Sequence, residues 1–112
     1  MSNVHIFPFH GELDFARKAY IEQELDRINS CGPQSVAILD LSGVKYVDSS
    51  FLNLLVHAEN NKVSDTTIRI VANGHIERVL TLTALDRLFP VFPDVRSACA
   101  FGHGTDSVRL AV

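Results

Sequence analysis

The segment that most constrains the fold is the stretch from Val36 to Leu55, which reads VAILDLSGVKYVDSSFLNLL. It opens with Val36–Leu39, a continuous apolar run of the kind found in strands that are covered on both faces. The apolar residues that follow Ser50 recur instead at helical spacing. We therefore expect a strand, a polar turn and a helix in succession, with helices packed on both sides of the sheet.

The N-terminal part of the chain predicts a strand and a helix before this segment. Val4–Phe9 is β-prone but contains Pro8, which lacks a backbone donor, so we place this strand at a sheet edge or end it there. Gly11 is expected to open a turn. Asp14 is a plausible N-cap for a helix over about Phe15–Ile28.

The same alternation continues to the C-terminus. Asp40 is expected to end its strand or to cap a turn there. The later elements predicted from periodicity and turn residues are a helix over about Ser50–Asn61, a strand over Thr67–Val71, a helix containing Ile76, Val79 and Leu80, a short strand over Phe89–Phe92, and a short helix from Asp94 to about Phe101.

This rhythm predicts an α/β domain with a largely parallel sheet and about four helices. The 112 residues fit one domain, because domains cluster around roughly 100–150 residues. We expect that domain to cover residues 1–101 and a loose tail to cover residues 102–112.

Composition narrows the range of partners. Hydrophobic residues make up 46% of the chain and charged residues 21%, as in ordinary globular proteins. No apolar run approaches the roughly 20 residues of a membrane helix, and the N-terminus lacks the layout of a signal peptide. The formal charge is −3 without long blocks of like charge, which argues against nucleic-acid binding. We expect a cytoplasmic protein that neither enters a membrane nor binds DNA directly.

Common enzyme signatures are missing from the sequence. It contains no G-x-x-x-x-G-K-[ST] or G-x-G-x-x-G loop, and no G-x-S-x-G elbow surrounds its serines. Its histidines lack the spacing of a helical metal site, and its two cysteines form no C-x-x-C. We expect no metal, no cofactor and no catalysis. A small hydrolase using Asp40 or Asp48 is the weaker alternative, because its catalytic constellation is incomplete.

The turn Asp48-Ser49-Ser50 has two interpretations. These residue types are preferred helix N-caps, so their side chains can simply satisfy the free N–H groups of the first helical turn. Alternatively, the positive end of the helix macrodipole and its unpaired N–H groups favour an anion, such as a phosphate on Ser49 or Ser50. The second interpretation makes the turn a switch.

Three segments together resemble the STAS domain of anti-sigma factor antagonists, and the resemblance covers about Val4–Phe101. The segments are GELD at Gly11–Asp14, VAILDLSGVKYVDSS at Val36–Ser50, and LTLTALDRLFPVFPDVRSACA at Leu80–Ala100. The resemblance implies a small single α/β domain with a mixed sheet. The residues that it marks as structural or family-motif positions are Asp14, Asp40 and Gly43.

The resemblance also implies a function. In that family the partner is an anti-sigma factor with serine kinase activity, and the unphosphorylated antagonist frees the sigma factor. The phosphate goes to the serine directly after the motif aspartate, here Ser49, and a serine phosphatase removes it. A phosphoserine would add about −1.5 to −2 charges beside Asp48, which opposes docking, while the helix N-terminus stabilises it.

The sequence departs from the family pattern directly after this motif, where Phe51-Leu52-Asn53 replaces the usual Gly-Leu-Gly. Phe51 then packs into the core, anchors the partner or obstructs the kinase. Leu52 and Val56 are either core residues or apolar contacts to the partner. The predicted partner-binding residues are Asp48, Ser49, Ser50, Phe51, Leu52 and Val56.

Domains that resemble this one also occur in transport systems, which leaves a second function open. In that alternative the chain is a soluble accessory subunit of a lipid-transport ATPase. Ser49 is then an interface residue that is never phosphorylated.

Overall fold

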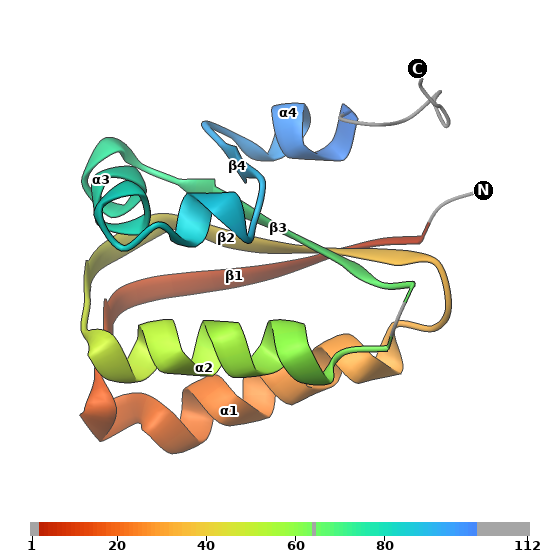
Figure 1. Ribbon diagram of the computed structural model, residues 1–112, viewed down its shortest axis with the longest axis horizontal. Helices are drawn as coiled ribbons and strands as arrows, with labels where there is room; N and C mark the ends of the chain where they lie inside the picture. The colour runs from red at the N-terminus through yellow and green to blue at the C-terminus, as the bar shows by residue number, and fades with distance from the viewer. Residues whose placement is uncertain (1–2, 64, 101–112) are drawn as a thin grey trace.

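The computed structural model describes residues 3–63 and 65–100 of the chain as a four-stranded sheet with helices on both faces (Figure 1). In chain order the elements are β1 (Asn3–Leu13), η1 (Phe15–Arg17), α1 (Lys18–Asp26), η2 (Arg27–Ser30), β2 (Ser35–Val47), α2 (Ser49–Asn61), β3 (Thr67–Ala72), α3 (Gly74–Leu82), η3 (Leu85–Arg87), β4 (Val91–Phe92) and α4 (Val95–Ala100). The strands lie in the order β1-β2-β3-β4, and each of the three pairings in this part of the chain is parallel. The predicted α/β fold is confirmed.

The central strand β2 is longer than the sequence predicted. It pairs with β3 from Val36 to Leu41 and continues to Val47 alongside β1 alone. Asp40 therefore does not end the strand. Its Oδ1 accepts hydrogen bonds from the N–H of Ser42 at 3.0 Å and from the Ser42 hydroxyl at 2.7 Å, next to a register shift. Asp40 thus lies at a bulge of β2, where its side chain bonds to the next residue but one.

The edge position predicted for β1 is confirmed, because β2 is the only strand of the described residues that pairs with β1. The strand nevertheless passes Pro8, with one register shift between Pro8 and His10 and another between Gly11 and Glu12. Gly11 has a φ of 73°, which glycine adopts without steric cost. The turn expected at Gly11 is thus wrong: the glycine lies inside the strand, next to a register shift at which β2 carries the extra residue Lys45.

The core lies mainly between the sheet and α1, α2 and α3. Its largest fully buried side chains are Phe9, Phe51, Phe89, Leu13, Ile21, Ile28, Leu39, Leu41, Leu55, Ile70 and Ile76. On the opposite face a smaller cluster forms where Ala98 of α4 packs on Val36, Ile38 and Val71. Burying each large apolar side chain stabilises the fold by about 1.5–3 kcal/mol. The expectation that both faces are covered is confirmed.

Two aspartates precede helical segments in different ways. Asp14 occupies the predicted N-cap position, but a 3-10 turn follows it and its side chain makes no capping hydrogen bond. Asp94 caps α4, because its Oδ1 accepts from the Ser97 N–H at 2.7 Å and from the Ser97 hydroxyl at 2.8 Å. The N–H bond is the main cause that lowers the pKa of Asp94. Phe101 and the predicted tail over residues 102–112 lie outside the described residues.

Candidate functional site

The Asp48-Ser49-Ser50 turn connects β2 to α2 at the edge of the sheet where the parallel strands end (Figure 1). Open parallel sheets usually place their binding sites at this edge. Ser49 is exposed, while Asp48 and Ser50 are partly buried. Of the two serines in the turn, Ser49 is therefore the more exposed one.

Asp48 is the N-cap of α2 and holds three backbone N–H groups. Its Oδ1 accepts from Ser50 at 2.9 Å and from Phe51 at 3.3 Å, and its Oδ2 accepts from Phe15 at 3.1 Å. Its own N–H donates to the carbonyl of Leu13 at 3.2 Å. Asp48 therefore ties the start of α2 to the end of β1, and the capping interpretation is confirmed for this residue.

Ser49 has no capping role. It is the first residue of α2, and its hydroxyl makes no hydrogen bond within residues 3–63 and 65–100. Because the carboxylate beside it satisfies the helix start, the hydroxyl stays free at the surface. This division of roles among the three turn residues does not follow from their types, since all three are good N-caps.

The hydrogen bonds of Asp48 also affect how well the start of α2 could stabilise a phosphate on Ser49. The N–H groups of Ser50 and Phe51, which the phosphate hypothesis needs, are already bonded to the carboxylate of Asp48. An anion on Ser49 would therefore add to an existing negative charge instead of neutralising an empty helix terminus. These two N–H groups could hold a phosphate only by leaving Asp48, and the negative charge of Asp48 would oppose that phosphate.

Phe51 belongs to the core. It is 0% exposed, and its ring lies 6.3 Å from the ring of Phe9 at an interplanar angle of 65°, an edge arrangement. Phe51 thus cannot touch a partner directly, and its place among the predicted partner-binding residues is corrected. The large side chain that replaces a family glycine points inward, which leaves the surface at Ser49 open.

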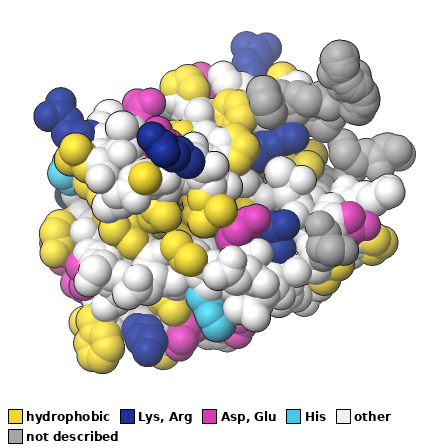
Figure 2. Space-filling view, in the orientation of Figure 1, with side chains coloured by type: hydrophobic (Ala, Val, Ile, Leu, Met, Phe, Trp, Pro, Cys, Tyr) yellow, Lys and Arg dark blue, Asp and Glu magenta, His cyan; other side chains and the backbone are white. Residues whose placement is uncertain are grey.

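Leu52 and Val56 keep part of their surface exposed on α2. Figure 2 shows apolar side chains gathered on the face between α2 and α3. Leu52 and Val79 pack partly buried against the core, and Leu82 at the end of α3 is 78% exposed. Sequence reasoning missed Leu82. The signal was its position outside the helical spacing of the buried residues Ile76 and Leu80.

A second missed feature lies beside the turn on the α1 side. Phe15, whose N–H bonds to Asp48, is 68% exposed. Together with Lys18 and Ser50 it borders a surface hollow of about 330 Å³. A large apolar residue at a helix start, directly after the motif Asp14, was the signal that could have found it.

The remaining motif residues act on the backbone. A Cβ added to Gly43 would lie 3.0 Å from Nδ1 of His10, its partner on β1, so a side chain there would press on the neighbouring strand. One buried oxygen of Asp14 has no hydrogen-bond partner in the described structure. No group of three potential His, Cys, Asp or Glu metal ligands occurs among those residues either. None of their helices is long and apolar enough to span a membrane.

Comparisons with known proteins identify the family and the fold. The family model of the STAS domain matches residues 2–98. A crystal structure of an anti-sigma factor antagonist from Mycobacterium paratuberculosis has 28% identity and a TM-score of 0.79, covering 87% of this chain and 83% of that one. A Thermotoga maritima protein proposed to be an anti-sigma factor antagonist has 27% identity and a TM-score of 0.74, over 86% and 84%. A sulfate transporter family protein from Wolinella succinogenes shares the fold at 19% identity and a TM-score of 0.73, over 88% and 83%.

Proposed function

The chain belongs to the STAS domain family, and from that premise we propose that it is an anti-sigma factor antagonist that acts by partner switching, with Ser49 as its phosphorylation site. The observation that carries the proposal is the division of roles at the start of α2. Ser49 is exposed and free of hydrogen bonds in the described structure, while Asp48 beside it caps the helix. A kinase can therefore modify Ser49 without removing a capping interaction.

The proposed docking surface surrounds this hydroxyl. It consists of Asp48, Ser49 and Ser50 with the partly exposed Leu52 and Val56. Phe51 supports the surface from beneath, since it anchors the first turn of α2 in the core. The exposed Phe15 extends the surface on the α1 side. Protein interfaces typically combine an apolar centre with a polar rim, and Leu52, Val56 and Phe15 would supply the apolar part of this surface.

Phosphorylation would switch this surface off by charge. A phosphoserine carries about −1.5 to −2 charges at neutral pH, and at Ser49 it would stand beside the carboxylate of Asp48. Docking would then bury two like charges among apolar side chains, and such juxtapositions cost several kcal/mol. The fold itself would be preserved, because the side chain of Ser49 lies outside the core.

In this proposal the protein is a cytoplasmic, non-catalytic regulator. Its partners are an anti-sigma factor with serine kinase activity and a serine phosphatase that reverses the modification. The protein acts on transcription without binding DNA itself, which fits its formal charge of −3. The likeness to the sulfate transporter family protein supports the fold alone, so we do not propose a transport role.

The direct test is phosphorylation by the anti-sigma factor kinase with ATP, followed by mass spectrometry of the peptide that contains the turn. We expect one phosphate on Ser49 and none in the Ser49→Ala variant. Ser50→Ala is the matched control and should be modified like the wild type. Modification of Ser50 alone, or an unmodified wild type that still binds the kinase, would contradict the proposal.

A further inference from the structure

A groove between α1 and α2 lies next to the proposed docking surface. It consists of two adjoining hollows of about 330 Å³ each, and Glu22, Leu54 and His57 line both of them. One hollow reaches the turn through Ser50. The other reaches Asn61 at the end of α2. A helix rises about 1.5 Å per residue, so the groove follows α2 for roughly 16 Å.

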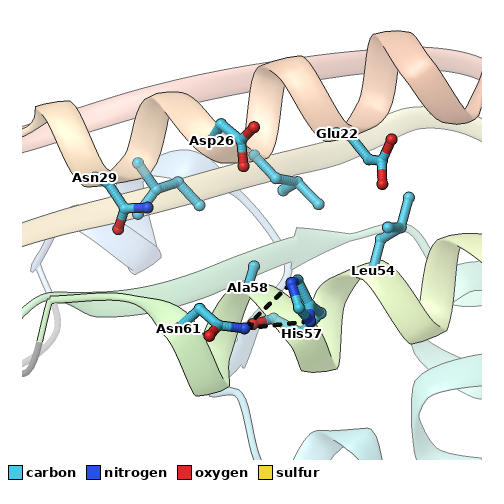
Figure 3. A pocket seen from close by; sticks show the side chains of 9 residues that line it. Glu22, Asp26, Asn29, Leu54, His57, Ala58 and Asn61 are labelled. Carbon is cyan, nitrogen blue, oxygen red and sulfur yellow. Dashed lines mark hydrogen bonds between the residues drawn. The ribbon is translucent and has the colours of Figure 1, made fainter.

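The two helices give the groove walls of different chemistry (Figure 3). Leu25 of α1, Ile28 of η2 and Ala58 of α2 supply apolar surface. Glu22 and Asp26 stand exposed on the α1 wall, and His57 and Asn61 face them from α2. The groove thus has apolar walls and, in the hollow that reaches Asn61, an acidic edge without a lysine or arginine.

Among the described residues, the two carboxylates of this edge form no ion pair, although Lys18 borders one of the two hollows. Other acidic side chains of these helices form ion pairs: Glu24 with Arg27 at 2.9 Å and Glu59 with Lys62 at 3.4 Å. Glu22 and Asp26 make no ion pair within the described residues. His57 is held by Asn61, whose Nδ2 lies 3.2 Å from both ring nitrogens and donates to the His57 carbonyl at 2.8 Å.

We propose that this groove binds a basic amphipathic segment of the partner protein, so that the partner contacts both the groove and the Ser49 turn. Lysine and arginine place an aliphatic stem on apolar surface and a charged head at its edge, which matches apolar walls bordered by Glu22 and Asp26. The length of the groove favours a peptide segment over a single small cation. The identification of the anti-sigma factor as the partner rests on the proposed function. The inference that the groove binds a basic amphipathic segment does not.

A defined peptide tests the groove chemistry alone. The probe is a 14-residue synthetic helix former of leucine and lysine at amphipathic spacing, titrated into the ¹⁵N-labelled full chain. Its control has glutamate in place of every lysine. We expect amide shifts at Glu22, His57 and Asn61 with the lysine peptide, weakening as salt is added, and no saturable shifts with the glutamate peptide.

Charge reversal supplies the matched variants. Glu22→Lys with Asp26→Lys should weaken the lysine peptide about tenfold, since each exposed ion pair contributes roughly 0.2–1 kcal/mol. Asp86→Lys, on the exposed η3, should leave its affinity unchanged. If the double variant fails to fold, Glu22→Gln with Asp26→Asn replaces it, with a smaller expected loss.

Three outcomes would overturn the proposal. The first two are equal binding of the two peptides and an unchanged affinity in the charge variants. The third is a set of amide shifts at the groove that depends on protein concentration without any peptide, which would show that a second copy of the chain occupies the groove. The anti-sigma factor provides a separate measurement: its binding should weaken about tenfold in the double variant while Ser49 is still phosphorylated in the wild type. If Ser49 takes no phosphate but the lysine peptide binds the groove, the proposed function fails and the groove chemistry stands.

Discussion

Two strand-to-helix junctions of this domain have nearly the same backbone design. Asp48 leads from β2 into α2, and Asn73 leads from β3 into α3. Both residues have extended backbones, and both accept hydrogen bonds from N–H groups of the first helical turn. Each junction lies at the end of a parallel strand, at the same edge of the sheet. Cap geometry alone therefore does not distinguish a site from a plain connection.

The difference lies in the side chains. Asp48 carries a carboxylate and is followed by Ser49, whose hydroxyl bonds to none of the described residues, whereas Asn73 is neutral and is followed by Gly74. The amide of Asn73 also donates to the carbonyl of Val44 at 2.9 Å, so its side chain is used to join α3 to β2. The α2 junction keeps a modifiable hydroxyl at the surface. At the α3 junction the polar side-chain atoms of Asn73 form hydrogen bonds within the fold.

The largest effect is expected beneath the α2 junction. Phe51→Ala should lower the free energy of unfolding by about 3–5 kcal/mol, because a fully buried ring leaves a cavity. Ile76, at the matching position of α3, is equally buried, and Ile76→Ala should cost about 2–5 kcal/mol. Urea unfolding measures both changes. A loss below 1 kcal/mol for Phe51→Ala would show that the ring is not a core residue.

Exchanging the two caps should have unequal costs. Asn73→Asp places a carboxylate against the carbonyls of Ser42 and Val44, which now accept from the amide, and should cost about 1–3 kcal/mol. Asp48→Asn keeps an oxygen acceptor at the start of α2 and should cost less than about 1 kcal/mol. Thermal melts of the two variants check the order. Equal losses in the free energy of unfolding would mean that the two capping side chains contribute equally to stability.

Alanine substitutions at two glycines should change the free energy of unfolding less, and by different amounts at a strand position and at a helix start. Gly43→Ala brings a methyl group to 3.0 Å from Nδ1 of His10, and should cost about 1 kcal/mol because that exposed side chain can move. At Gly74 an added Cβ meets nothing within 4 Å, so Gly74→Ala should be neutral or slightly stabilising. Chemical denaturation resolves the difference, and a stabilising Gly43→Ala would contradict the crowding described here.

No phosphorylation is expected at a serine that is placed at the start of α3. Gly74→Ser gives the α3 junction a serine at the position that Ser49 has in α2, and open space surrounds it. The anti-sigma factor kinase should leave residue 74 unmodified and phosphorylate Ser49 as before. Mass spectrometry after a full reaction tests this. Equal phosphate on both serines would mean that the kinase recognises a helix start and not the surface around Ser49.

The sequence predicted the architecture well where burial alone decides it. The apolar run Val36–Leu39 indicated a strand covered on both faces, and both faces are covered. It predicted less well where a polar residue interrupts a strand. Asp40 looked like a strand end because its turn chemistry is local, whereas the pairing that carries β2 on to Val47 comes from the distant β1. The pattern of neighbouring residues in the sequence cannot show that a distant strand pairs with a segment and extends it.

The same limit applies to the candidate site. The resemblance singled out Ser49, but the residue types could not say which of three N-capping residues would take the cap. That choice depends on Phe15, whose N–H reaches the second oxygen of Asp48 across 33 positions in sequence. The burial of Phe51 was one of three open roles, and contact with Phe9 of β1 decides it.

The measurement that tests the central claim most directly is binding of the anti-sigma factor to protein carrying phosphoserine at defined positions. Three homogeneous proteins are compared by calorimetry: unmodified, phosphoserine at position 49, and phosphoserine at position 74. We expect phosphate on Ser49 to weaken binding at least tenfold, equivalent to about 1.4 kcal/mol, with an unchanged fold by circular dichroism. Phosphoserine in place of Gly74 should bind like the unmodified protein. Equal affinities for the unmodified protein and the protein phosphorylated on Ser49 would contradict the account.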